Sequence, residues 1–108
     1  MENNEKLICG LTDAQILQLK EKHGFLILGE VQQAGTTYQA VFKEPDFKTL
    51  EATGAVGEKN AIKGTISLFD NCVVASDPEL SQRDFLKLKA VECLAQHMNS
   101  FNVTVKNL

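Results

Sequence analysis

Two residues near the carboxyl end of the chain carry side chains that could bind a metal ion. Cys93 and His97 are four residues apart, so on a helix they point in the same direction. Thiolate and imidazole are preferred zinc ligands, but a structural zinc site needs four ligands and the chain has no C-x-x-C pair to complete one. Both residues also fall on an apolar helical face, where a cysteine packs as a small hydrophobic residue. We therefore expect core packing here, with no metal and no cofactor.

A cysteine nucleophile with a histidine base is the second chemistry that these residue types could support. The candidate thiols are Cys72 and Cys93, and the candidate bases are His23 and His97. Such a pair requires an exposed thiol in electropositive surroundings and a third group that orients the base. Both cysteines have aliphatic neighbours in the sequence, which would raise the thiol pKa. A small cysteine-dependent hydrolase is therefore the less favoured alternative.

Two further segments resemble catalytic motifs only in composition. GAVGEK, residues 54–59, has two glycines and a lysine, but it lacks the spacing of a phosphate-binding loop and follows no predicted strand. The acids Glu44, Asp46 and Glu51 lie among lysines, a pattern that is typical of a solvated charged surface. We therefore expect a protein without enzymatic activity.

Length and composition favour one soluble domain. The chain has 108 residues, of which 44% are hydrophobic, enough for one core. A net charge of −3 without a basic cluster argues against nucleic-acid binding. The first residues lack the basic segment of a signal peptide, and no apolar run reaches the roughly 20 residues that span a bilayer. Three widely spaced cysteines suit the reducing cytoplasm, so we expect a cytoplasmic protein that binds neither nucleic acid nor membrane.

The spacing of apolar and turn-forming residues predicts an α+β fold. Thr12 and Gln15 form a capping-box pattern, and Gly24 is a typical helix end. Two apolar runs around a glycine-containing turn predict a β-hairpin. After Pro45 the apolar period becomes helical. The predicted elements are an N-terminal tail at 1–10 and one domain at 11–108, with a helix at 12–23, a hairpin at 25–43, and helices at about 46–53, 58–73 and 81–98.

The predicted hairpin must pack one face on other elements, because an isolated hairpin is only marginally stable in water. We expect it to lie on a bundle of about three helices, with the helix at 81–98 the most buried. TGAVG, residues 53–57, predicts a helix end and a loop. In FNVTVKNL, residues 101–108, Val103 and Val105 alternate with polar residues, so this segment either adds a third short C-terminal strand or trails from the domain.

An ordered set of short motifs runs from residue 11 to about residue 98. It begins with L-T-x-x-Q-I-x-x-L-x-x-x-x-G at 11–24, continues with a strand pair ending at Phe42, and reaches Pro45–Asp46 at the start of the helices. Asn71–Cys72–Val73, the loop at 77–80 and an alanine-rich last helix follow. This order resembles the small tail-assembly chaperones of tailed phages. Members of that family usually carry an arginine at the position of Glu44 and a tryptophan at that of Val73.

The resemblance implies a non-enzymatic protein that keeps the phage tape-measure protein, and tail-tube subunits, soluble until the tail polymerises. An apolar groove would cover an amphipathic helix of the partner. The alternative is a structural or tail-completion component of the virion, and in either role we expect self-association. The candidate groove residues could each belong to the core instead. The candidate partner-binding residues are Lys43, Glu44 and Asp46 at the junction and Phe47, Leu50, Ile62 and Phe69 in the groove.

Overall fold

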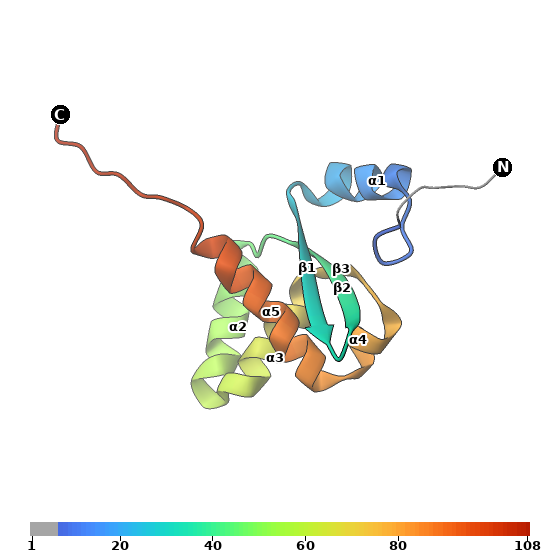
Figure 1. The fold of residues 1–108 in the computed structure, drawn as a ribbon. Helices are drawn as coiled ribbons and strands as arrows, with labels where there is room; N and C mark the ends of the chain where they lie inside the picture. Colours follow the sequence, from blue (N-terminus) through green and yellow to red (C-terminus); the bar gives the residue numbers. More distant parts are fainter. Residues whose placement is uncertain (1–6) are drawn as a thin grey trace.

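The computed structural model describes residues 7–108, which form five helices and one three-stranded antiparallel sheet (Figure 1). The predicted α+β class, with an N-terminal helix and a β-hairpin, is confirmed. The first six residues of the predicted N-terminal tail lie outside the described residues. The elements are α1 (Asp13–His23), β1 (Leu26–Gln33), β2 (Thr36–Lys43), α2 (Phe47–Lys59), α3 (Ala61–Cys72), β3 (Val73–Ser76), α4 (Pro78–Gln82) and α5 (Asp84–Met98).

Helix α1 begins and ends where its local sequence predicts. The Thr12 hydroxyl accepts a hydrogen bond from the Gln15 backbone N–H at 3.2 Å, and the Gln15 side chain accepts one from the Thr12 N–H at 2.9 Å. Gly24 ends the helix with a φ of 82°, a value that glycine adopts without a steric penalty. No residue of α1 is buried, and the helix lies apart from the other helices in Figure 1.

The hairpin of β1 and β2 closes through a two-residue turn. Ala34 and Gly35 both have positive φ, 50° and 80°, as a type I′ turn requires. Residues pair in register from Gln33 opposite Thr36 to Leu26 opposite Lys43. Strand β3 pairs with the other side of β2, so the strand order is β1-β2-β3 and β1 forms an edge of the sheet.

The core lies between one face of this sheet and helices α3 and α5. The Phe42 and Phe69 rings meet edge to face with their centroids 5.6 Å apart, which joins β2 to α3. Helix α5 crosses β1 and supplies more buried core residues than any other helix, as its apolar face predicts. The buried residues of the core are Ile27, Ala40, Phe42, Phe69, Cys72, Leu80, Leu86, Ala90, Val91 and Leu94.

The predicted loop at residues 53–57 is wrong, because α2 continues through this segment to Lys59. Asn60 alone separates α2 from α3, and its side-chain carbonyl accepts a hydrogen bond from the Lys63 N–H at 3.0 Å to cap α3. Gly57 in α2 and Gly64 in α3 face each other where the two helices approach closely. A Cβ on Gly64 would lie only 2.6 Å from the Gly57 Cα atom.

The third strand, which the sequence placed in residues 101–108 only as one of two alternatives, lies elsewhere. It is formed by the β-branched and small residues 73–76 and not by residues 101–108, which adopt no regular structure. Helix 58–73 therefore ends one residue early, at Cys72. The helix predicted at 81–98 divides into α4, which starts at Pro78, and α5, with a break at Arg83.

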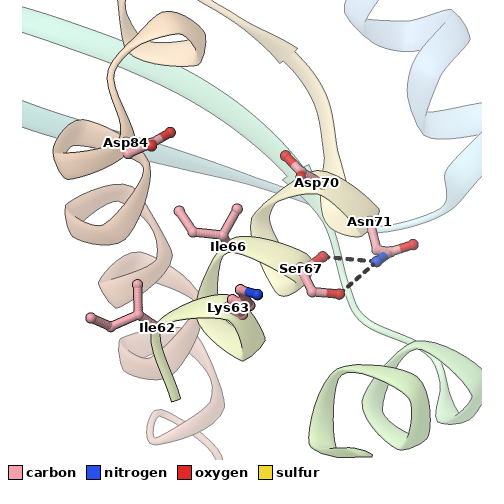
Figure 2. Close-up of a pocket in the computed structure, with 7 residues that line it drawn as sticks. All are labelled: Ile62, Lys63, Ile66, Ser67, Asp70, Asn71 and Asp84. Carbon is pink, nitrogen blue, oxygen red and sulfur yellow. Dashed lines mark hydrogen bonds between the residues drawn. The ribbon is translucent and has the colours of Figure 1, made fainter. Parts of the chain in front are cut away.

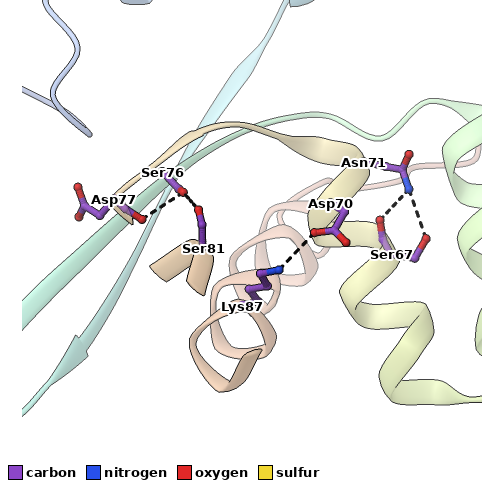
Figure 3. Close-up of polar contacts among 7 residues, drawn as sticks. All are labelled: Ser67, Asp70, Asn71, Ser76, Asp77, Ser81 and Lys87. Carbon is purple, nitrogen blue, oxygen red and sulfur yellow. Dashed lines mark hydrogen bonds and ion pairs between the residues drawn. The ribbon is translucent and has the colours of Figure 1, made fainter. Parts of the chain in front are cut away.

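Polar contacts hold the segments around β3 together (Figure 3). The hydroxyls of Ser76 and Ser81 form a hydrogen bond between the end of β3 and α4. The Lys87 ammonium lies 3.6 Å from an Asp70 carboxylate oxygen and joins α5 to α3. These contacts connect the helices that cover the sheet.

Candidate partner-binding surface

The junction between β2 and α2 is built around a helix cap. The Asp46 carboxylate accepts a hydrogen bond from the Thr49 N–H at 2.8 Å. This hydrogen bond lowers the pKa of Asp46 below its ordinary value, and the nearby Lys43 and Lys48 charges lower it further. Pro45 needs no amide partner at this position, because its ring leaves no N–H to pair. Asp46 therefore starts α2, and Lys43 ends the strand before it.

Glu44 has a partner that the sequence analysis missed. Its carboxylate lies 2.5 Å from Nε2 of His97, which is in the last turn of α5. The His97 ring also stacks on Phe25, with centroids 5.4 Å apart, and meets Phe101 edge to face at 5.2 Å. Because Glu44 and His97 are 53 residues apart, no local sequence pattern could have indicated the pair. It ties the end of β2 to the end of α5.

An apolar depression of about 420 Å³ lies between α2 and α3. Its floor is shallow where Gly57 and Gly64 bring the two helix backbones together, since neither side contributes a side chain there. Leu50 and Leu68 contribute the largest apolar side chains of its lining. The lining residues are Leu50, Thr53, Gly54, Gly57, Ala61, Gly64, Thr65 and Leu68.

Phe47 extends the apolar surface beyond this depression. Phe47 and Leu50 are three residues apart on α2, so their side chains lie on the same side of the helix. Phe47 is 75% exposed and Leu50 is 45% exposed. Helices α2 and α3 form a helical hairpin, which is distinct from the β-hairpin of β1 and β2. We call the surface formed by Phe47, Leu50 and the depression between these two helices the hairpin groove.

Ile62 belongs to a different depression, of about 460 Å³, between α3 and the start of α5 (Figure 2). The Ile62 side chain is 65% exposed, and Ile66 lies on the same side of α3. Asp70 and Asp84 lie at the other end of this site. The structure therefore does not bring Ile62 together with Phe47 and Leu50.

Phe69, the last candidate groove residue, lies in the core. Its side chain is only 2% exposed and contacts Phe42, so a partner cannot reach it without unfolding α3 from the sheet. Of the four apolar candidates, two share the hairpin groove, one lies in a second depression and one is interior.

The thiols of the chain lie in protected surroundings. Cys72 is fully buried, and burial raises the pKa of its thiol. The Cys9 thiol donates a hydrogen bond to the Gln39 carbonyl at 3.2 Å, and burial together with the Asp77 charge raises its pKa to about 11. Cys93 packs against β1, since a Cβ on Gly29 would lie 2.9 Å from the Cys93 sulfur.

Two features are absent from residues 7–108. No three side chains of histidine, cysteine, aspartate or glutamate gather there in a way that could hold a metal ion. Within the same residues, each helix is too short or too polar to cross a membrane.

No protein-family model matches the chain, and no curated protein matches it. Among solved structures, the chain is similar to one described as the structure of uncharacterised protein rbstp2171 from Bacillus stearothermophilus. The TM-score is 0.60 at 15% sequence identity, and the match covers 85% of this chain and 99% of that one. At this identity the similarity concerns the fold alone.

Proposed function

We propose that this protein is a non-enzymatic tail-assembly chaperone of a phage or prophage. It acts in the cytoplasm of the bacterial host, where it binds the tape-measure protein, and tail-tube subunits, before they polymerise. The proposal joins the order of sequence motifs from residue 11 to about residue 98 with an accessible apolar surface on the folded chain.

The hairpin groove is the observation that carries this proposal. An amphipathic helix buries its apolar side chains in a groove of this type, with anchors spaced at three and four residues. Phe47 and Leu50 offer exposed apolar area at the groove, and the close approach of Gly57 and Gly64 leaves the floor between α2 and α3 without large side chains. A long helical partner such as a tape-measure protein has the chemistry that this surface would recognise.

The exposed fractions of Phe47 and Leu50 set how much each side chain can contribute to the free energy of binding. Full burial of a leucine or phenylalanine side chain contributes about 1.5–3 kcal/mol. Leu50 has about half of its surface to bury and Phe47 about three quarters, which together amounts to about 3 kcal/mol. Because 1.4 kcal/mol is a factor of ten, removal of both side chains should weaken binding by about 100-fold.

Co-expression with the tape-measure protein from the same phage genome tests the proposal. We expect the wild-type chain to raise the soluble yield of that protein and to co-purify with it. The double variant Phe47→Ser/Leu50→Ser should lose both effects. Phe85→Ser is the matched control, because Phe85 is 63% exposed on α5, away from the hairpin groove, and its loss should leave binding unchanged.

Two results would count against this function. If the wild-type chain changes neither the solubility nor the recovery of the tape-measure protein, the chaperone role is wrong. If mass spectrometry finds the chain in finished particles at a stoichiometric level, the protein is a structural component of the virion, because a chaperone leaves before assembly is complete.

A further inference from the structure

The outer edge of β1 presents unpaired backbone groups. A β-turn joins the residues on its two sides by a hydrogen bond, so Gln33 and Thr36 form a hydrogen-bonded pair. In an antiparallel ladder such pairs alternate with pairs that are not hydrogen-bonded. The backbone N–H and C=O groups that point away from β2 are therefore those of Leu26, Leu28, Glu30 and Gln32.

The contacts of Gln39 support this assignment independently. Gln39 lies opposite Glu30, and its N–H donates to the Asp77 carboxylate at 2.7 Å on the β3 side. Its carbonyl accepts from the Asp77 N–H at 2.8 Å, also on that side. Gln39 thus has no backbone group left for Glu30, whose own groups face outward. In residues 7–108, no backbone hydrogen bond from outside the hairpin reaches β1.

Residues 101–108, which we call the C-terminal segment, have the composition of a strand without a partner. Phe101, Val103, Val105 and Leu108 are apolar and exposed, and the two valines are each 87% exposed. A segment that only trails in solvent gains nothing from β-branched residues that alternate with polar ones, whereas a strand with one buried face requires them. In Figure 1 this segment extends away from the body of the molecule.

We propose that the C-terminal segment of one copy of this chain adds to the outer edge of β1 in a second copy, as a fourth strand. Strand β1 offers eight residues along which residues 101–108 can pair. Main-chain hydrogen bonds supply the attraction, as in other cases of strand addition. This inference does not depend on the chaperone role.

The direction of the segment favours a second copy over the segment's own β1. The ring of Phe101 packs against His97 at the end of α5, and the residues that follow point away from the sheet. Reciprocal exchange between two copies pairs both segments and covers both edges in one closed dimer. It also removes the exposed sheet edge that would otherwise promote uncontrolled association.

Light scattering across a dilution series, on the full chain and on a chain that ends at Ser100, tests this proposal. We expect the full chain to show twice the mass of one chain at high concentration and the truncated chain to remain monomeric. At concentrations where the full chain is monomeric, both should have the same circular dichroism, because the C-terminal segment has no regular structure in a single copy.

A matched pair of substitutions tests the edge itself. Glu30→Pro removes one outward N–H and should weaken the dimer by about tenfold, whereas Glu30→Ala keeps this N–H and should not. In the dimer, hydrogen exchange should slow at the amides of Leu26, Leu28, Glu30 and Gln32, and dilution should restore it.

Three outcomes would overturn the proposal. They are a full chain that is monomeric at every concentration, a dimer that survives truncation at Ser100, and edge amides that stay protected in the diluted monomer. The last would mean that the C-terminal segment folds back onto its own β1.

Discussion

The contact between Gly57 and Gly64 leads to an asymmetric prediction for substitutions in α2 and α3. A Cβ on Gly64 would lie 2.6 Å from the Gly57 Cα atom, 3.0 Å from the Gly57 nitrogen and 3.3 Å from the Thr53 carbonyl oxygen. All three are backbone atoms, which cannot rotate away. The Gly64→Ala variant therefore has to push the two helices apart, whereas a Cβ on Gly57 would lie 3.9 Å from the Gly64 Cα atom, at ordinary contact distance.

Two opposing effects set the size of the change. Overpacking of this kind costs about 1–3 kcal/mol. Replacing glycine by alanine inside a helix returns about 1 kcal/mol through the helix propensity. We therefore expect Gly64→Ala to lower the free energy of unfolding by up to about 2 kcal/mol. Gly54→Ala, whose Cβ would meet no atom within 4 Å, should raise it by about 0.5–1 kcal/mol.

Urea denaturation followed by circular dichroism measures both variants on one scale. The midpoint should fall for Gly64→Ala and rise for Gly54→Ala, with an unchanged slope of unfolding free energy against urea. If the two variants are equally stable, the close approach of α2 and α3 does not require glycine at position 64, and the contact between Gly57 and Gly64 does not shape the hairpin groove.

Three further experiments with substituted chains test other contacts. Asp46→Ala should lower the urea midpoint near neutral pH. Because folding lowers the pKa of Asp46, its contribution to the free energy of unfolding is complete above the ordinary pKa of 3.8 and disappears as the pH falls through the lowered pKa. A loss of stability in Asp46→Ala that does not change with pH would contradict the cap. A double-mutant cycle on Glu44 and His97 should give a coupling energy below about 1 kcal/mol, because the pair is partly exposed. Added salt should reduce this coupling energy, and a coupling energy that salt does not change would argue against an ion pair. Gly29→Ala should destabilise the fold by about 1–3 kcal/mol, and adding Cys93→Ala should recover part of this loss; no recovery would show that the sulfur contact is not the cause.

Local elements were predicted well where neighbouring residues determine them. The cap of α1 depends on Thr12 and Gln15, three residues apart, and the hairpin depends on a turn whose Gly35 tolerates positive φ. These interactions form between residues that are close in the chain, so their residue types are sufficient evidence. The α+β class follows from the same local patterns.

The candidate site was predicted only in part, because burial depends on segments that are distant in the chain. Phe47 and Phe69 are both phenylalanines at helical positions, yet one is exposed on α2 and the other packs on Phe42 from β2. Ile62 has the same apolar character as Leu50, but the two lie in separate depressions. Apolar character alone does not say which surface a residue joins.

The sequence by itself determined where the chain turns and caps, and therefore its first helix, its hairpin and its class. Only the tertiary structure decided that the glycines near residue 57 lie inside a helix, that residues 73–76 form the third strand, and that Glu44 meets His97. The physical reason is that glycine, short β-branched runs and single charges have weak local preferences. For Gly57 the contact with α3 outweighs the local preference, and for residues 73–76 the pairing with β2 does so. For Glu44 the contact with His97 at the end of α5 has the same effect.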